Sequence, residues 1–146
     1  MTNKVPLPAL LLGLAGLIPP VGLTVVPWLL TRNLGWHAGR LLEIYAALIL
    51  SFLGGAWWAF ACREEQPSFG LLAIAVVPSL AAWAAVSLLL PLEALLALTL
   101  LLLAALVVDA ALVRRALAPG WWMGLRIPLS TGLALCCGLS AFALSR

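Results

Sequence analysis

Charged side chains are scarce in this sequence, and their scarcity decides the class of protein. Only 9% of the 146 residues are Asp, Glu, Lys or Arg, whereas hydrophobic residues make up 65%. A typical soluble domain has about 25% charged and about 45–50% apolar residues. The polar side chains present here are too few to coat a surface in water. The composition therefore predicts a protein that lies within a lipid bilayer.

Residue types that build metal, nucleic-acid and catalytic sites are also scarce. His37 is the single histidine, and the three cysteines have neither metal-ligand spacing nor an even count. The eight Lys and Arg residues are scattered, whereas a nucleic-acid groove needs them clustered. The sequence contains no nucleophile elbow, phosphate loop or dinucleotide fingerprint. We therefore expect no metal, no cofactor and no nucleic-acid partner, and an enzymatic function is disfavoured.

Long apolar runs are what the sequence does contain. A transmembrane helix needs about 20 mainly apolar residues, because it rises 1.5 Å per residue across about 30 Å of hydrocarbon. Helices also satisfy their own backbone polar groups, which lipid cannot do. The sequence predicts one all-α domain over residues 1–146, a bundle of five transmembrane helices joined by short loops. The expected spans are about 6–30, 41–61, 69–90, 92–113 and 121–144.

The distribution of Lys and Arg between the loops predicts the orientation in the membrane. The side that holds the N-terminus carries Lys4, Arg63, Arg114, Arg115 and Arg126. The opposite side carries Arg32, Arg40 and Arg146. Because cytoplasmic loops are richer in basic residues, we expect a multi-pass protein of the inner membrane. Its N-terminus is expected in the cytoplasm and its C-terminus outside.

Small residues recur at steps of four in the second span. Ala47, Ser51, Gly55 and Ala59 form one stripe, and Gly54 lies beside it. In lipid, small residues mark close helix contacts, because helix association there depends on tight packing and polar contacts. We interpret the stripe as a packing face within the bundle. A homo-oligomer or another membrane protein is the alternative partner for this face.

Prolines interrupt two of the expected spans. Pro19 and Pro20 lie near the middle of the first, where a kink or break is expected, and Pro78 lies within the third. Trp83 is placed deeper than the other tryptophans, which fit the span ends. A proline-broken helix can leave backbone carbonyls free beside a cavity. The pattern predicts a pocket near Pro19, Pro20, Ser51 and Pro78.

Two ionisable residues at matching depths suggest an ion pair within the membrane. Asp109 lies about one turn before the end of the fourth span, and Arg126 about one turn after the start of the fifth. Charges inside a bilayer are costly, and pairing offsets part of their desolvation. We therefore expect Asp109 and Arg126 to pair between helices. A substrate or proton site, or snorkelling of each side chain to the interface, is the alternative.

At the other end of the bundle the sequence places a second polar group. Arg40 and Glu43 are three residues apart, a spacing that permits pairing on one helix face. His37, Tyr45 and Glu93 belong to the same end. Together these residues predict a small polar mouth, with ordinary interfacial polarity as the alternative.

Several phrases of the sequence resemble those of a known membrane family. They are Leu12–Pro19, Tyr45–Gly55, Val77–Leu80 with Trp83, Asp109 and Leu125–Leu129. On these phrases the chain is similar, over nearly its whole length, to the domain-of-unknown-function family that includes transmembrane protein 69. The resemblance implies a helical membrane fold and no particular activity. Trp57 and Pro20 depart from it, since the family often has a basic or histidine residue at the first position and an aromatic residue at the second.

Three functions are compatible with these features. The first is an accessory or assembly factor of a membrane complex that acts by contacts, since catalytic groups are lacking and small-residue faces are present. The second is binding or transport of a small apolar or amphipathic ligand, or of a lipid, in a pocket between the helices. The third is a membrane enzyme that uses Asp109 or Glu43 as acid or base, which requires that carboxylate to be unpaired and to face a cavity.

Overall fold

The computed structural model describes residues 4–146, and the described part of the chain is helical without strands. Five helical stretches are long and apolar enough to cross a membrane, which confirms the expected multi-pass helical bundle. The first stretch is divided into two helices, and the other four are continuous. The helices are α1 (Leu7–Ala15), α2 (Ile18–Leu29), α3 (Arg32–Ala61), α4 (Phe69–Leu88), α5 (Pro91–Arg114) and α6 (Trp122–Leu144).

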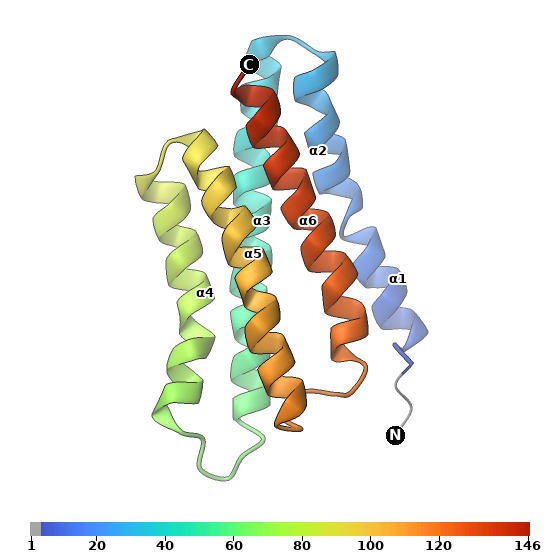
Figure 1. Ribbon diagram of the computed structural model, residues 1–146, viewed down its shortest axis with the longest axis vertical. Helices are drawn as coiled ribbons and strands as arrows, with labels where there is room; N and C mark the ends of the chain where they lie inside the picture. The colour runs from blue at the N-terminus through green and yellow to red at the C-terminus, as the bar shows by residue number, and fades with distance from the viewer. Residues whose placement is uncertain (1–3) are drawn as a thin grey trace.

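The long helix α3 is the centre of the bundle. It contacts α2, α4, α5 and α6. The start of α1 and the end of α6 lie at opposite ends of the molecule (Figure 1). Helices α4 and α5 flank one side of α3, and α2 and α6 flank the other (Figure 1). The end of the molecule at which α1 begins also holds the α3–α4 loop and the α5–α6 turn (Figure 1).

The second span begins earlier than predicted. The sequence predicts a start at about residue 41, but α3 already begins at Arg32 and runs for 30 residues. No proline interrupts this segment, and two glycines let it approach its neighbours closely. A Cβ on Gly35 would lie 3.2 Å from Pro27 Cα, and one on Gly39 would lie 2.7 Å from Leu144 Cδ1. Packing against α2 and α6 therefore extends α3 to about 45 Å, beyond the ~30 Å hydrocarbon thickness.

The predicted break in the first span is present, slightly before the proline pair. Helix α1 ends at Ala15, and α2 begins at Ile18 with Pro19 and Pro20 in its first turn. Proline is tolerated there because the first backbone N–H groups of a helix have no partner within it. The break therefore falls at Gly16 and Leu17. By contrast, α4 continues through Pro78 as one helix.

The close helix contact of α3 lies at Gly54 and not along the predicted small-residue stripe. A Cβ on Gly54 would lie 2.5 Å from Ala75 O in α4, whereas a Cβ on Gly55 would meet nothing within 4 Å. Gly55 and Ala59 are exposed, and Ala47 and Ser51 are half-buried. Gly55 and Ala59 therefore face away from the helix contacts, and the prediction of a packing face is wrong at these two positions. Gly54 makes the close contact, and Ala47 packs against the core.

Candidate functional site

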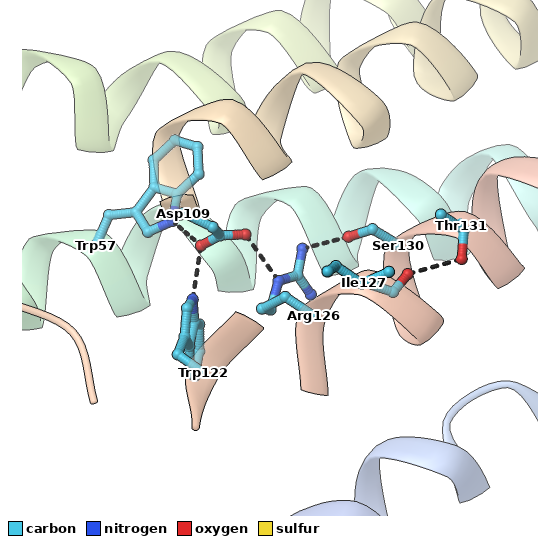
Figure 2. A network of polar contacts seen from close by, with 7 residues as sticks. All are labelled: Trp57, Asp109, Trp122, Arg126, Ile127, Ser130 and Thr131. Atoms are coloured by element: carbon cyan, nitrogen blue, oxygen red, sulfur yellow. Dashed lines mark hydrogen bonds and ion pairs between the residues drawn. The ribbon is translucent and has the colours of Figure 1, made fainter. Parts of the chain in front are cut away.

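A cluster of polar side chains lies within the bundle near the end that holds the α5–α6 turn. Asp109 of α5 is completely buried, and its Oδ1 accepts hydrogen bonds from Trp57 Nε1 at 2.8 Å and Trp122 Nε1 at 2.7 Å (Figure 2). Its Oδ2 accepts a hydrogen bond from Arg126 Nε at 3.0 Å (Figure 2). One carboxylate thus joins α3, α5 and α6.

Arg126 extends this cluster along α6. Its Nη2 donates to Ser130 Oγ at 2.7 Å, and its side chain is only 8% exposed. Arg126 lies about 6 Å inside the start of α6, and Asp109 about 8 Å inside the end of α5, from the rise per residue. The two residues that the sequence placed at matching depth are therefore in contact. Because both Asp109 oxygens are engaged, this carboxylate is not the unpaired acid or base that an enzyme would require.

A groove of about 380 Å³ lies beside this cluster, between α1, α3 and α6. Tyr45, Ile49 and Phe52 line it from α3, and it is bounded at one end by Trp121, Trp122 and Arg126. The remaining lining residues are aliphatic or glycine: Ala9, Leu12, Gly13, Gly16, Leu17, Leu125, Leu129 and Leu133. A volume of this size is within the range of small-molecule sites, which are mostly apolar with few polar groups.

The groove exists because of the break in the first span. Helix α1 has no buried residue, and its contacts are with α6 (Figure 1). The break leaves the carbonyl of Gly16 without a helical partner, and Tyr45 Oη donates a hydrogen bond to this oxygen at 2.5 Å. Gly13 approaches α6, since a Cβ there would lie 2.9 Å from Leu129 Cδ1. Helix α1 thus forms a side wall that leaves space in front of α3.

The pocket expected near the prolines is not where the groove lies. Pro20 and Pro78 are buried, and Pro78 packs next to Gly54. Pro19, Ser51 and Trp83 do not line the groove, and Trp83 is 63% exposed. The groove instead lies beside α1, the helix that precedes the break.

The residues predicted to form one polar mouth are dispersed. Arg40 Nη1 donates to Glu43 Oε2 at 2.7 Å and also to Val86 O at 3.1 Å. Glu93 accepts a hydrogen bond from the Leu90 backbone N–H at the start of α5 at 3.3 Å. Tyr45 donates its hydrogen bond to the Gly16 carbonyl between α1 and α2, and His37 is exposed. Only Arg40 and Glu43 remain together.

Glu43 has an incomplete set of partners. Its side chain is fully buried, and its Oε1 makes no hydrogen bond in the described part of the chain. Ser140 Oγ of α6 is likewise buried without a partner there. Glu43 is not among the residues that line the groove. Over residues 4–146, no group of three or more His, Cys, Asp or Glu side chains is placed to hold a metal ion.

Sequence reasoning missed the two indole donors and the groove. Trp57 and Trp122 were expected only in the interfacial belt, although both fall at the same end of the bundle as Asp109. A buried carboxylate needs more donors than one Arg nitrogen, and this need was the signal that could have pointed to nearby tryptophans. No sequence signal specifies how far α1 tilts, so the groove could not be located.

Comparison with known proteins finds a transmembrane relative and a family of unknown function. Transmembrane protein 69 of Xenopus tropicalis is 43% identical over 86 residues, which are 55% of this chain and 32% of that protein. The chain thus spans about a third of the length of this relative. No solved structure matches the chain significantly. A family model described as protein of unknown function, DUF3429, matches residues 5–142. Since this match covers nearly all of the sequence, the chain belongs to the DUF3429 family of membrane proteins.

Proposed function

We propose that the protein binds an amphipathic molecule of the membrane in the groove between α1, α3 and α6. The observation that carries this proposal is the combination of an apolar groove with a small polar end. The groove holds about 380 Å³ among mainly aliphatic and aromatic side chains, and Arg126 stands at one end. Small-molecule sites combine these two features, because apolar walls supply affinity and a few polar groups fix orientation.

The test is purification from native membranes in a gentle detergent, followed by mass spectrometry of retained lipids, small molecules and proteins. Ile49→Trp would fill the groove, since Ile49 lines it. Leu48→Trp is the matched control, because Leu48 is the preceding residue on α3, is 63% exposed and lies outside the groove. We expect the unsubstituted protein and Leu48→Trp to retain a small amphipath that Ile49→Trp loses. Equal retention by both variants would contradict the proposal.

An accessory or assembly role in a membrane complex is the second candidate. The exposed Gly55 and Ala59 favour it, because small residues on a lipid-facing helix surface allow another helix to approach closely. The same purification tests this role. A protein retained in fixed stoichiometry, and lost when Gly55 is replaced by Leu, would support it over ligand binding.

We also infer that the protein lies in the inner membrane with its N-terminus in the cytoplasm. The support is the excess of basic residues at the end that holds Lys4, Arg63, Arg114 and Arg115. Cytoplasmic ends of membrane helices carry this excess. In this orientation the groove opens in the cytoplasmic half of the bilayer.

A further inference from the structure

Arg126 has one nitrogen that the polar cluster does not use. Its Nε donates to Asp109 and its Nη2 to Ser130, whereas Nη1 has no partner in the described part of the chain (Figure 2). A charged donor that faces an apolar environment without a partner costs free energy. Arg126, fixed by these two hydrogen bonds, therefore keeps Nη1 as a donor without a partner in the described part of the chain.

This nitrogen is not fully enclosed by protein, and it belongs to a residue that lines the groove. Within residues 4–146, the fully enclosed polar side-chain atoms without a partner are Glu43 Oε1 and Ser140 Oγ, so Arg126 Nη1 is not sealed in protein. Arg126 is one of the groove's lining residues. The small exposed part of its side chain thus adjoins the space that an amphipath would fill.

The charge around Arg126 indicates what kind of group the nitrogen accepts. Asp109 balances the guanidinium charge through the contact at 3.0 Å. The pair is neutral as a whole, so a second anion would face a carboxylate as well as a guanidinium. A neutral oxygen acceptor satisfies the donor without that repulsion. A carbonyl oxygen is such an acceptor.

The position of the groove in the bilayer indicates which molecule brings that carbonyl. The groove extends along α6 from Trp122 to Leu133, about 17 Å at the rise of a helix, which ends near the middle of this helix. It therefore occupies one half of the bilayer thickness, as one hydrocarbon chain does. Trp121 and Trp122 mark the interface, and Arg126 lies about 6 Å below Trp122. An ester-linked lipid has its groups in the same order of depth: the head group at the interface, then the ester carbonyl, then the hydrocarbon chain.

We propose that the groove holds one acyl chain of an ester-linked glycerolipid from this half of the bilayer, with its ester carbonyl accepting a hydrogen bond from Arg126 Nη1. This inference rests on the proposed function and specifies its ligand. The glycerol head lies beside Trp121, and the chain extends past Leu125 toward Tyr45 and Leu133. The interaction is non-covalent, so the lipid is held and not consumed.

The test compares two lipids that differ only in the carbonyl. Dioleoylphosphatidylcholine and its dioleyl diether analogue have the same head group and chain length, and their zwitterionic head adds no net charge. Binding to the protein in detergent is measured by native mass spectrometry and by the rise in melting temperature. We expect the diester to bind at least about ten-fold more tightly, since hydrogen bonds to charged groups stabilise by more than those between neutral groups.

Each outcome decides between the inference and the function on which it rests. Equal affinity for diester and diether would overturn the role of Arg126 Nη1 but leave lipid binding in the groove intact. Failure of both lipids to bind would overturn the ester-lipid ligand, whereas equal lipid binding by Ile49→Trp would overturn both this ligand and the groove as the binding site. Tighter binding of a short-chain ubiquinone than of the diester would overturn the ester-lipid ligand.

A variant of Arg126 provides a second measurement. Arg126→Met removes every donor of the guanidinium, while Asp109 keeps its hydrogen bonds from Trp57 and Trp122, so Arg126 offers no donor to the groove. We expect this variant to bind diester and diether equally, with the affinity of the unsubstituted protein for the diether. A retained preference for the diester would overturn the proposal. If the variant does not fold, the comparison of the two lipids on the unsubstituted protein still decides.

Discussion

Two carboxylates lie fully buried in the bundle, and their surroundings differ. Asp109 has hydrogen-bond donors on both oxygens, from three side chains. Glu43 has one donor on Oε2, and its Oε1 is without a partner in the described part of the chain. Burial of a charge costs free energy that hydrogen bonds and ion pairs must offset. We therefore expect Asp109 to stabilise the bundle at one end and Glu43 to be dispensable for stability at the other.

Replacement of Asp109 by Leu is expected to lower the free energy of unfolding by about 3–5 kcal/mol, the usual cost of breaking a buried ion pair. The variant leaves Arg126 charged and buried, and it removes the acceptor of Trp57 and Trp122. Denaturation with sodium dodecyl sulfate in mixed micelles measures the change. The double variant Asp109→Leu with Arg126→Met is the control and should regain most of the loss. A loss under about 1 kcal/mol in the single variant would show that the cluster is solvated.

Replacement of Glu43 by Met is expected to leave the free energy of unfolding within about 1 kcal/mol, or to raise it, because apolar side chains often replace buried charges without loss. Arg40 is half exposed and keeps its bond to Val86 O, so no buried charge is left without a partner. The same denaturation measurement applies. A loss of more than about 2 kcal/mol would instead assign a stabilising role to the Glu43 carboxylate.

At the scale of the helices, one residue step around α3 separates a contact from an open surface. A Cβ on Gly54 would lie 2.5 Å from a backbone oxygen of α4, which cannot move without displacing that helix. A Cβ on the neighbouring Gly55 would lie in open space. These two glycines form a matched pair, because they share the same helix and depth.

Gly54→Ala is expected to lower the melting temperature, with a loss of about 1–3 kcal/mol from overpacking. Gly55→Ala should be neutral within about 0.5 kcal/mol, or stabilising, because Ala favours the helix over Gly. Thermal unfolding in detergent compares the two variants. Equal losses would mean that Gly55 is also covered, as in a complex with another copy or another protein.

The same helix separates what the sequence predicts from what it leaves open. The spans, their short loops and the matching depths of Asp109 and Arg126 follow from apolar length and from counting residues along each helix. Rotation about the helix axis does not follow, because Gly54 and Gly55 are equally small and only packing decides which faces α4. The start of α3 was misplaced for a related reason: polar residues do not end a helix when neighbouring helices pack against it. The groove depends on the tilt of α1, which no residue pattern specifies.

For the whole molecule, five spans place the two ends of the chain on opposite sides of a membrane (Figure 1). Cys62 is the native probe of this topology. It is exposed at the end of α3, on the same side as Lys4, whereas Cys136 and Cys137 are buried.

We expect a membrane-impermeant maleimide to label Cys62 in inside-out vesicles and not in right-side-out vesicles. The reason is the excess of basic residues on this side, which favours the cytoplasm. A Cys62→Ser protein with Ser145→Cys, at the exposed opposite end, is the control and should show the reverse pattern. Labelling of Cys62 from the outer side only would invert the orientation.

The attachment of α1 has a kinetic consequence. This helix buries none of its own residues, and it is held by contacts with α6 and by the bond between Tyr45 Oη and the Gly16 carbonyl. Elements with so few buried contacts open locally while the rest of a protein stays folded. Whatever occupies the groove can then exchange sideways with the bilayer as α1 swings about Gly16 and Leu17, on a timescale set by one short helix. The residence time of a molecule in the groove therefore does not depend on how long the bundle stays folded.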